Sequence, residues 1–114
     1  MTRYWFALVA AAAMMCALGV SPAAAADAGS GEDTYMFMGC WTCHGTVGQG
    51  ARGPAIAPGP LPFEAFAAYV RQPPGEMPPF REAILSEAML QDIHAYLAAI
   101  PAAPDVGDTI LAGE

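Results

Sequence analysis

The chain has 114 residues and a formal net charge of −7 at pH 7, and its only lysine or arginine residues are four arginines. A nucleic-acid-binding protein needs clustered basic side chains to displace counterions from phosphates, so this composition excludes that class. It also argues against docking on anionic membranes. A partner with a basic docking surface fits better, because opposite charges speed the encounter. Solubility alone is the alternative explanation of the acidic charge.

Residues 1–26 have the three parts of a secretory signal peptide. Arg3 provides a basic start, residues 4–20 form an apolar run, and Ala24 to Ala26 offer a small-residue cleavage site. The apolar run is at the short limit for a bilayer span, which favours cleavage over retention as an anchor. Cleavage leaves residues 27–114 as one small domain without stable membrane insertion, and with a net charge of −8, because only Arg3 among the charged residues is lost.

The stretch that follows predicts a flexible start and then a short helix. Residues 27–31 are small and polar, and no helix breaker occurs between about Gly31 and Gly39. Residues 45–62 are rich in glycine and proline, which predicts a compact loop. Ile56 and Leu61 are apolar and are expected to be buried within it.

A second helix is predicted from Phe63 to Val70, where apolar residues recur at positions i, i+3, i+4 and i+7. Pro62 suits its start, and Pro73 with the proline after it ends the helix. The next segment, up to Phe80, holds four prolines and a glycine, so it predicts a stiff loop.

The last predicted helix is capped by Ser86, with Glu87 near its positive end. Its apolar stripe, at helical spacing, consists of Met89, Leu90, Ile93, Tyr96, Leu97 and Ile100. Pro101 stops the helix, and residues 105–114 are expected to form a flexible tail. The pattern as a whole predicts an all-α fold with long loops.

Two cysteines remain after the leader, in the sequence Cys40-Trp41-Thr42-Cys43-His44. In an exported protein, C-x-x-C-H is the pattern of covalent haem attachment. Two thiols at this spacing fit on one helical turn and can bond to the two vinyl groups of the porphyrin. His44 then lies under the iron, where its imidazole can serve as a ligand.

Three other interpretations of the cysteine pair remain open. A thioredoxin-like dithiol uses C-x-x-C but belongs in a βαβ unit, and no run of β-branched residues is present. A zinc site needs four ligands, whereas only Cys40, Cys43, His44 and the distant His94 are available. A simple disulfide in a short loop is the third possibility.

Met77 is the predicted second iron ligand if a haem is bound. It lies in the middle of the proline-rich loop, where little conformational freedom is left, and its thioether suits haem iron. Met36 and Met38 are too close to Cys40 to reach the opposite face of the haem. Met89 is expected in the core and His94 on a partly exposed helix flank.

These motifs together resemble those of the class I c-type cytochromes, which are small exported electron carriers with one haem. The resemblance covers almost all of residues 27–114. It rests on the C-x-x-C-H motif, on Gly53-Pro54, on the segment from Gly75 to Phe80, and on residues 92–97. It implies a small cytochrome c fold, with three to four short helices wrapped around one covalent haem c.

The resemblance also implies roles for individual residues. The carbonyl of Pro54 is expected to hold the second ring nitrogen of His44, and Ile56 to pack on the haem. Gly31 and Tyr35 are expected to cross the last helix near Ile93 and Tyr96.

The segment between His44 and Met77 is short for this family, so the loops that cover the haem propionates must be trimmed. Arg71 is the best candidate for a propionate contact, and Arg52 is a weaker one. Trp41, between the cysteines, is expected either to be an exposed docking contact or to pack against the macrocycle, with packing favoured.

The function implied is that of a periplasmic one-electron carrier and not of an enzyme. By analogy it accepts electrons from a periplasmic dehydrogenase, as a free carrier or as the cytochrome subunit, and passes them towards a terminal oxidase. The main alternative is a haem enzyme or gas sensor with an open sixth iron position. A haem-free interaction or dithiol module is the third class.

Overall fold

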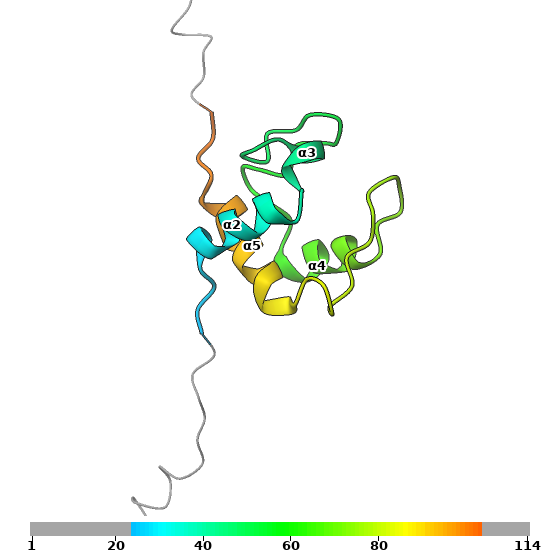
Figure 1. Cartoon of the computed structure of the whole chain (residues 1–114). Coiled ribbons are helices and arrows are strands. Elements are labelled where there is room, and N and C mark those ends of the chain that lie inside the picture. Colours follow the sequence, from blue (N-terminus) through cyan, green and yellow to red (C-terminus); the bar gives the residue numbers. More distant parts are fainter. Residues whose placement is uncertain (1–23, 104–114) are drawn as a thin grey trace, which may run out of the picture.

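The computed structural model describes residues 24–103, which form helices and loops without a strand (Figure 1). The helices of this part are α2 (Ala28–Phe37), α3 (Trp41–His44), α4 (Phe63–Arg71) and α5 (Glu87–Ala99). The predicted all-α class is confirmed. Nearly all of the predicted signal peptide and the predicted tail at 105–114 lie outside the described residues. Within them, no helix is long and apolar enough to cross a membrane.

Helix α2 begins earlier than predicted, at Ala28 rather than near Gly31, so the expected flexible start at 27–31 is wrong. Asp27 is the N-cap, and its Oδ1 accepts a hydrogen bond from the Ser30 amide at 2.6 Å. That bond is the main reason why the pKa of Asp27 is lowered. The Asp27 amide donates to Oδ1 of Asp92 at 2.7 Å. The start of α2 is therefore tied to α5.

Helices α4 and α5 confirm the predictions from apolar spacing. Helix α4 begins directly after Pro62 and ends at Arg71, two residues before Pro73. The Ser86 hydroxyl caps α5 by accepting from the Met89 amide at 3.2 Å. Helix α5 ends two residues before Pro101. Proline has no amide hydrogen, so neither Pro73 nor Pro101 can donate a backbone hydrogen bond that would continue its helix.

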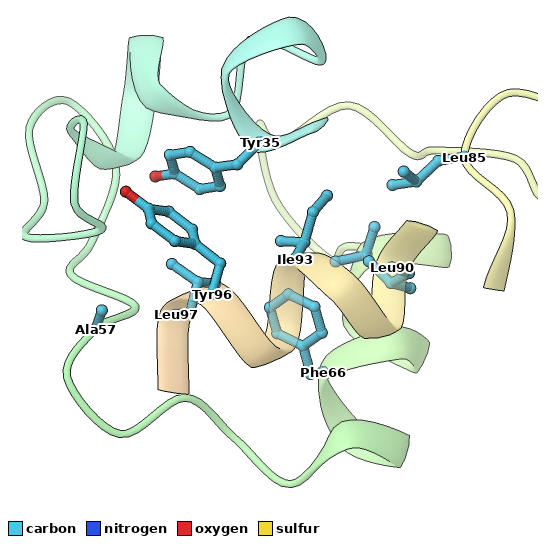
Figure 2. Close-up of a cluster of buried hydrophobic side chains, with 9 residues drawn as sticks. Tyr35, Ala57, Phe66, Leu85, Leu90, Ile93, Tyr96 and Leu97 are labelled. Carbon is cyan, nitrogen blue, oxygen red and sulfur yellow. The ribbon is translucent and has the colours of Figure 1, made fainter. Parts of the chain in front are cut away.

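Helices α2 and α5 cross in close contact, as the resemblance implied. A Cβ on Gly31 would overlap the Asp92 carbonyl and lie 2.9 Å from the Ile93 amide nitrogen, so a side chain has no room there. One turn further along α2, the ring of Tyr35 lies 5.5 Å from that of Tyr96 (Figure 2). The glycine and the aromatic pair together fix the crossing.

The core lies between these helices, α4 and the loops (Figure 2). Its buried apolar members are Tyr35, Ala57, Phe66, Val70, Leu85, Leu90, Ile93, Tyr96 and Leu97. Ile56 is half-buried and packs against this cluster. Leu61 is 54% exposed, so the expectation that it is buried is wrong.

Candidate functional site

The residues singled out from the sequence come together around one cavity of about 1250 Å³. Its lining includes Cys40, Cys43, His44, Pro54, Ile56 and Met77. Parts of α2, α3, α4, α5 and both long loops contribute to the wall. The volume exceeds the roughly 300–1,000 Å³ of common small-molecule pockets, and most lining side chains are apolar. The space and its lining suit a large, mainly apolar group such as a porphyrin.

His44 is held at the cavity with one ring nitrogen already paired. Its Nδ1 lies 2.8 Å from the carbonyl oxygen of Pro54, as the resemblance implied. A carbonyl oxygen only accepts hydrogen bonds, so Nδ1 carries the proton. Nε2 then keeps its lone pair, which is the state that a metal-binding imidazole needs. His44 is buried, so little water competes for this nitrogen.

The loop after His44 folds back onto it through backbone hydrogen bonds. The Gly53 amide donates to the Cys43 carbonyl at 2.7 Å, and the Gly50 amide donates to the His44 carbonyl at 2.7 Å. Gly53 approaches so closely that a Cβ there would lie 3.2 Å from Cε1 of the His44 ring. This contact places the following proline carbonyl against the imidazole. The Gly53-Pro54 pair is therefore part of the site's construction.

Two tyrosine hydroxyls hold the beginning of the same loop, a contact that the sequence did not predict. Tyr35 donates to the Gly45 carbonyl at 2.7 Å, and Tyr96 donates to the Thr46 carbonyl at 2.8 Å. In Figure 2 both hydroxyls lie on the same side of the pair, next to this loop. Burial raises the pKa of Tyr35 to about 12 and also raises that of Tyr96. Both therefore remain protonated donors at neutral pH.

The surroundings of Cys40 do not favour thiolate chemistry. Cys40 is half-buried, and burial raises the pKa of its thiol to about 11. A reactive dithiol or a metal-binding thiolate needs the opposite shift. Residues 24–103 contain no group of three or more His, Cys, Asp or Glu residues that could hold a metal ion. The dithiol and zinc interpretations therefore gain no support.

Met77 is half-buried, lines the cavity and packs against the core cluster. The loop that carries it returns to α4, because the Phe80 amide donates to the Val70 carbonyl at 3.1 Å. Arg71 strengthens this return, since its Nη1 donates to the Phe80 carbonyl at 2.9 Å. The ends of the Met77 loop are thus fixed against each other.

The two arginines named from the sequence are placed differently from expectation. Arg71, the favoured propionate contact, does not line the cavity and is engaged with the Phe80 carbonyl. Arg52, the weaker candidate, lines the cavity next to the Gly53-Pro54 pair. The sequence could not separate them, because the distinction depends on the contact of Arg71 with the Phe80 carbonyl, which forms only when the loop folds back on α4.

The other ligand candidates are also placed by the structure. Met38 lines the cavity, whereas Met89 and His94 do not. Nε2 of His94 lies 2.8 Å from the Leu61 carbonyl, and its ring packs edge-on against Phe66 at 5.3 Å. His94 is therefore a half-buried helix residue, as expected, and it also contacts α4, which was not predicted.

Among known proteins, a family model described as "Cytochrome C oxidase, cbb3-type, subunit III" matches residues 26–97, which is more than half of the chain. The comparisons with curated proteins and with solved structures gave no match. The family match spans the C-x-x-C-H motif, the Met77 loop and most of α5. Together with the all-helical fold, it supports the predicted resemblance to a small class I cytochrome c. The chain belongs to this family and contains a c-type cytochrome domain.

Proposed function

We propose that this chain is a periplasmic one-electron carrier with a single covalent haem c, bound through thioethers at Cys40 and Cys43. The cytochrome domain implies haem-based electron transfer. The carrier role is supported above all by one observation. His44, with its tautomer fixed by Pro54, and Met77, from a separate loop, line the same cavity as the two cysteines.

A haem bound here supplies an iron that alternates between the ferric and ferrous states. Nε2 of His44 and the thioether sulfur of Met77 would be the two protein ligands of that iron. With both bound, no position would be left for oxygen or peroxide. The mainly apolar lining would favour the less charged, reduced state of the bound group.

The proposed carrier receives electrons from a periplasmic dehydrogenase, as a free protein or as its cytochrome subunit, and passes them towards a terminal oxidase. Its strong negative charge suits partners with basic docking surfaces. The secretory leader predicted at 1–26 supports export to the compartment where covalent haem attachment takes place. The half-buried Cys40 and exposed Cys43 suit attachment of the haem near the protein surface.

The proposal is tested on protein matured together with its export and haem-attachment machinery. Peroxidase-type haem staining on a denaturing gel should remain with the polypeptide, because only a covalent haem survives denaturation. The ferric protein should be low-spin and show the weak sulfur-to-iron charge-transfer band of methionine ligation. A colourless protein with two titratable thiols would refute the carrier. A high-spin ferric spectrum without that band would favour the enzyme or gas-sensor alternative.

A further inference from the structure

Three large apolar side chains are exposed at the junction of α2 and α3. Phe37 is 85% exposed, Trp41 is 42% exposed and Met36 is 39% exposed. We call these three residues the apolar patch. Single exposed apolar residues are ordinary, but three within six residues form a local cluster, and aromatic residues and methionine are enriched in protein interfaces. Trp41 does not line the cavity, so the predicted packing against the macrocycle is not observed.

The apolar patch lies on the outer side of the cavity wall. The residues between its members and directly after them line the cavity: Met38, Gly39, Cys40, Thr42 and Cys43. A hydrogen bond from the Gly39 amide to the Met36 carbonyl, at 3.2 Å, holds the turn between the two helices. The apolar patch and these lining residues therefore belong to the same short chain segment. A molecule docked on the patch would contact the segment that carries Cys40 and Cys43.

The charged residues on α2 next to the apolar patch are both negative. Glu32 and Asp33 are exposed and lie one helical turn before Met36 and Phe37, on the same faces of α2. Residues 24–51 include no lysine or arginine. A second copy of the chain would bring like charges together around the patch. A partner with basic side chains around an apolar centre is complementary in both respects.

We propose that the apolar patch, with Glu32 and Asp33, is the docking surface for a redox protein that presents an apolar centre flanked by lysine or arginine. The apolar contact supplies most of the binding free energy, and the two carboxylates steer the encounter. This inference rests on the proposed carrier function, because it assigns the surface through which the electron leaves or enters.

Tris(1,10-phenanthroline)cobalt(III) is a suitable probe, because it is an apolar trication that accepts one electron. In stopped-flow oxidation of the ferrous holoprotein, iron(II) becomes iron(III) and cobalt(III) becomes cobalt(II). We expect Phe37→Gln to lower the second-order rate constant roughly fivefold, as for loss of a central interface side chain. Oxidation by the anionic, hydrophilic ferricyanide and the reduction potential should stay unchanged. Ile84→Gln is the matched control, because Ile84 is 64% exposed and lies outside the patch.

The charged residues are tested by the double variant Glu32→Gln, Asp33→Asn. It should weaken the dependence of the cobalt rate constant on ionic strength, because two of the steering charges are removed. Glu64→Gln with Glu82→Gln is the control, since it removes two exposed carboxylates outside the patch. An equal effect of the control pair would mean that net charge, and not this surface, steers the probe, and would overturn the proposal.

A second measurement does not depend on electron transfer. The paramagnetic chromium(III) analogue of the probe should broaden amide resonances of residues 32–42 in the NMR spectrum of the folded holoprotein, and Phe37→Gln should abolish that broadening. Broadening centred elsewhere, or a dimer that Phe37→Gln disrupts, would overturn the docking proposal while leaving the carrier function intact. Failure of the haem stain or of the low-spin spectrum would instead refute the carrier, whatever the NMR result.

Discussion

At the scale of single residues, the site depends on groups that act through one well-placed atom. The Pro54 carbonyl accepts a hydrogen bond from Nδ1 of His44 and so leaves Nε2 free. Proline has no amide hydrogen, so the backbone nitrogen at this position cannot donate a competing hydrogen bond. The Arg71 guanidinium, from α4, fixes the far end of the Met77 loop through one carbonyl. Neither contact is with the cofactor itself, yet each restricts where an axial ligand can lie.

Met77→Ala tests the proposed axial ligand. The haem should stay attached, because the two cysteines and His44 are untouched. The reduction potential should fall by on the order of 100 mV, since a thioether stabilises the ferrous iron. Azide and cyanide should bind to the ferric protein, because the sixth position becomes open. Potentiometry and ligand titration measure these effects.

Met89→Ala is the control for that experiment, because Met89 packs against the core but does not line the cavity. It should lower stability without admitting azide. A Met77→Ala protein with an unchanged potential, and with no more azide uptake than the unmodified protein, would exclude Met77 as ligand.

The candidate cofactor-binding residues could be predicted where the motif is local in sequence. The spacing of Cys40, Cys43 and His44 and the proline-locked Met77 are readable from the sequence, and the structure brings all four to one cavity. The partner of Arg71 was not predictable, because a guanidinium serves a propionate or a backbone carbonyl equally well. The backbone carbonyl is the partner in the structure, because the Met77 loop closes with Phe80 beside Arg71.

At the scale of elements, the crossing of α2 and α5 supports the loop that follows His44. Each helix contributes one tyrosine to the crossing, and each tyrosine hydroxyl holds one carbonyl of that loop. Any shift of α2 along α5 would move these two donors. The helix pair therefore acts as a rigid support for the imidazole side of the site.

Gly31→Ala tests the closeness of that crossing. The new methyl group would overlap the Asp92 carbonyl, which is backbone and cannot move away without displacing α5. We expect a loss of about 1–3 kcal/mol in the free energy of unfolding. Gly29→Ala, on the same helix, is the control, because its Cβ meets only the Asp27 carboxylate at 3.4 Å.

The Gly29→Ala control should be neutral, or stabilising by up to about 1 kcal/mol, because alanine favours the helix over glycine. Denaturant unfolding followed by far-UV circular dichroism compares the two variants with the unmodified protein. Equal stability of both variants would show that the helices separate readily at Gly31, and would contradict the close crossing.

The tyrosine contacts predict a pH dependence of stability. Burial raises the pKa of Tyr35 from 10.0 to about 12, so the unfolded chain loses this proton first. The contribution of Tyr35 is fully present below pH 10 and is lost as the pH rises through 12. Tyr35→Phe should lower stability by about 1–3 kcal/mol at neutral pH, because it leaves the Gly45 carbonyl unpaired.

Above pH 10 the difference between Tyr35→Phe and the unmodified protein should shrink, because only the latter loses stability through this group. Urea unfolding at several pH values measures the difference. Tyr69→Phe is the matched control, since Tyr69 is exposed. A constant difference across this range would show that the Tyr35 hydroxyl is not held in a buried contact.

Helix boundaries were predictable where the residues that mark them lie at the end of the helix itself or directly beside it. Pro73, Ser86 and Pro101 mark ends that the structure confirms. The start of α2 was missed, because its first turn is rich in glycine and its amide tie to Asp92 joins residues far apart in sequence. The tyrosine hydroxyl contacts were missed for the same reason, since nothing local distinguishes them from ordinary core aromatics.

At the scale of the whole molecule, nearly all of the core belongs to the cavity wall. Eight of the nine buried core residues also line the cavity: Tyr35, Ala57, Phe66, Val70, Leu85, Leu90, Ile93 and Leu97. In a chain of this size little other apolar surface is buried, so few contacts remain to hold the fold when the cavity is not filled. The stability of the fold is therefore expected to depend on the bound cofactor.

The double variant Cys40→Ala, Cys43→Ala tests this dependence, because it removes the expected attachment points. If the haem covers roughly 400 Å² of apolar surface, its loss costs on the order of 10 kcal/mol at ~25 cal/mol/Å². That equals the net stability of a whole domain, so the variant should lack a cooperative thermal transition in circular dichroism. Thr42→Ser, which keeps the hydroxyl that donates to the Gly39 carbonyl, is the control within the same motif. A double variant that melts cooperatively near the temperature of the unmodified protein would show that the helices pack without the haem, and that the shared wall is self-supporting.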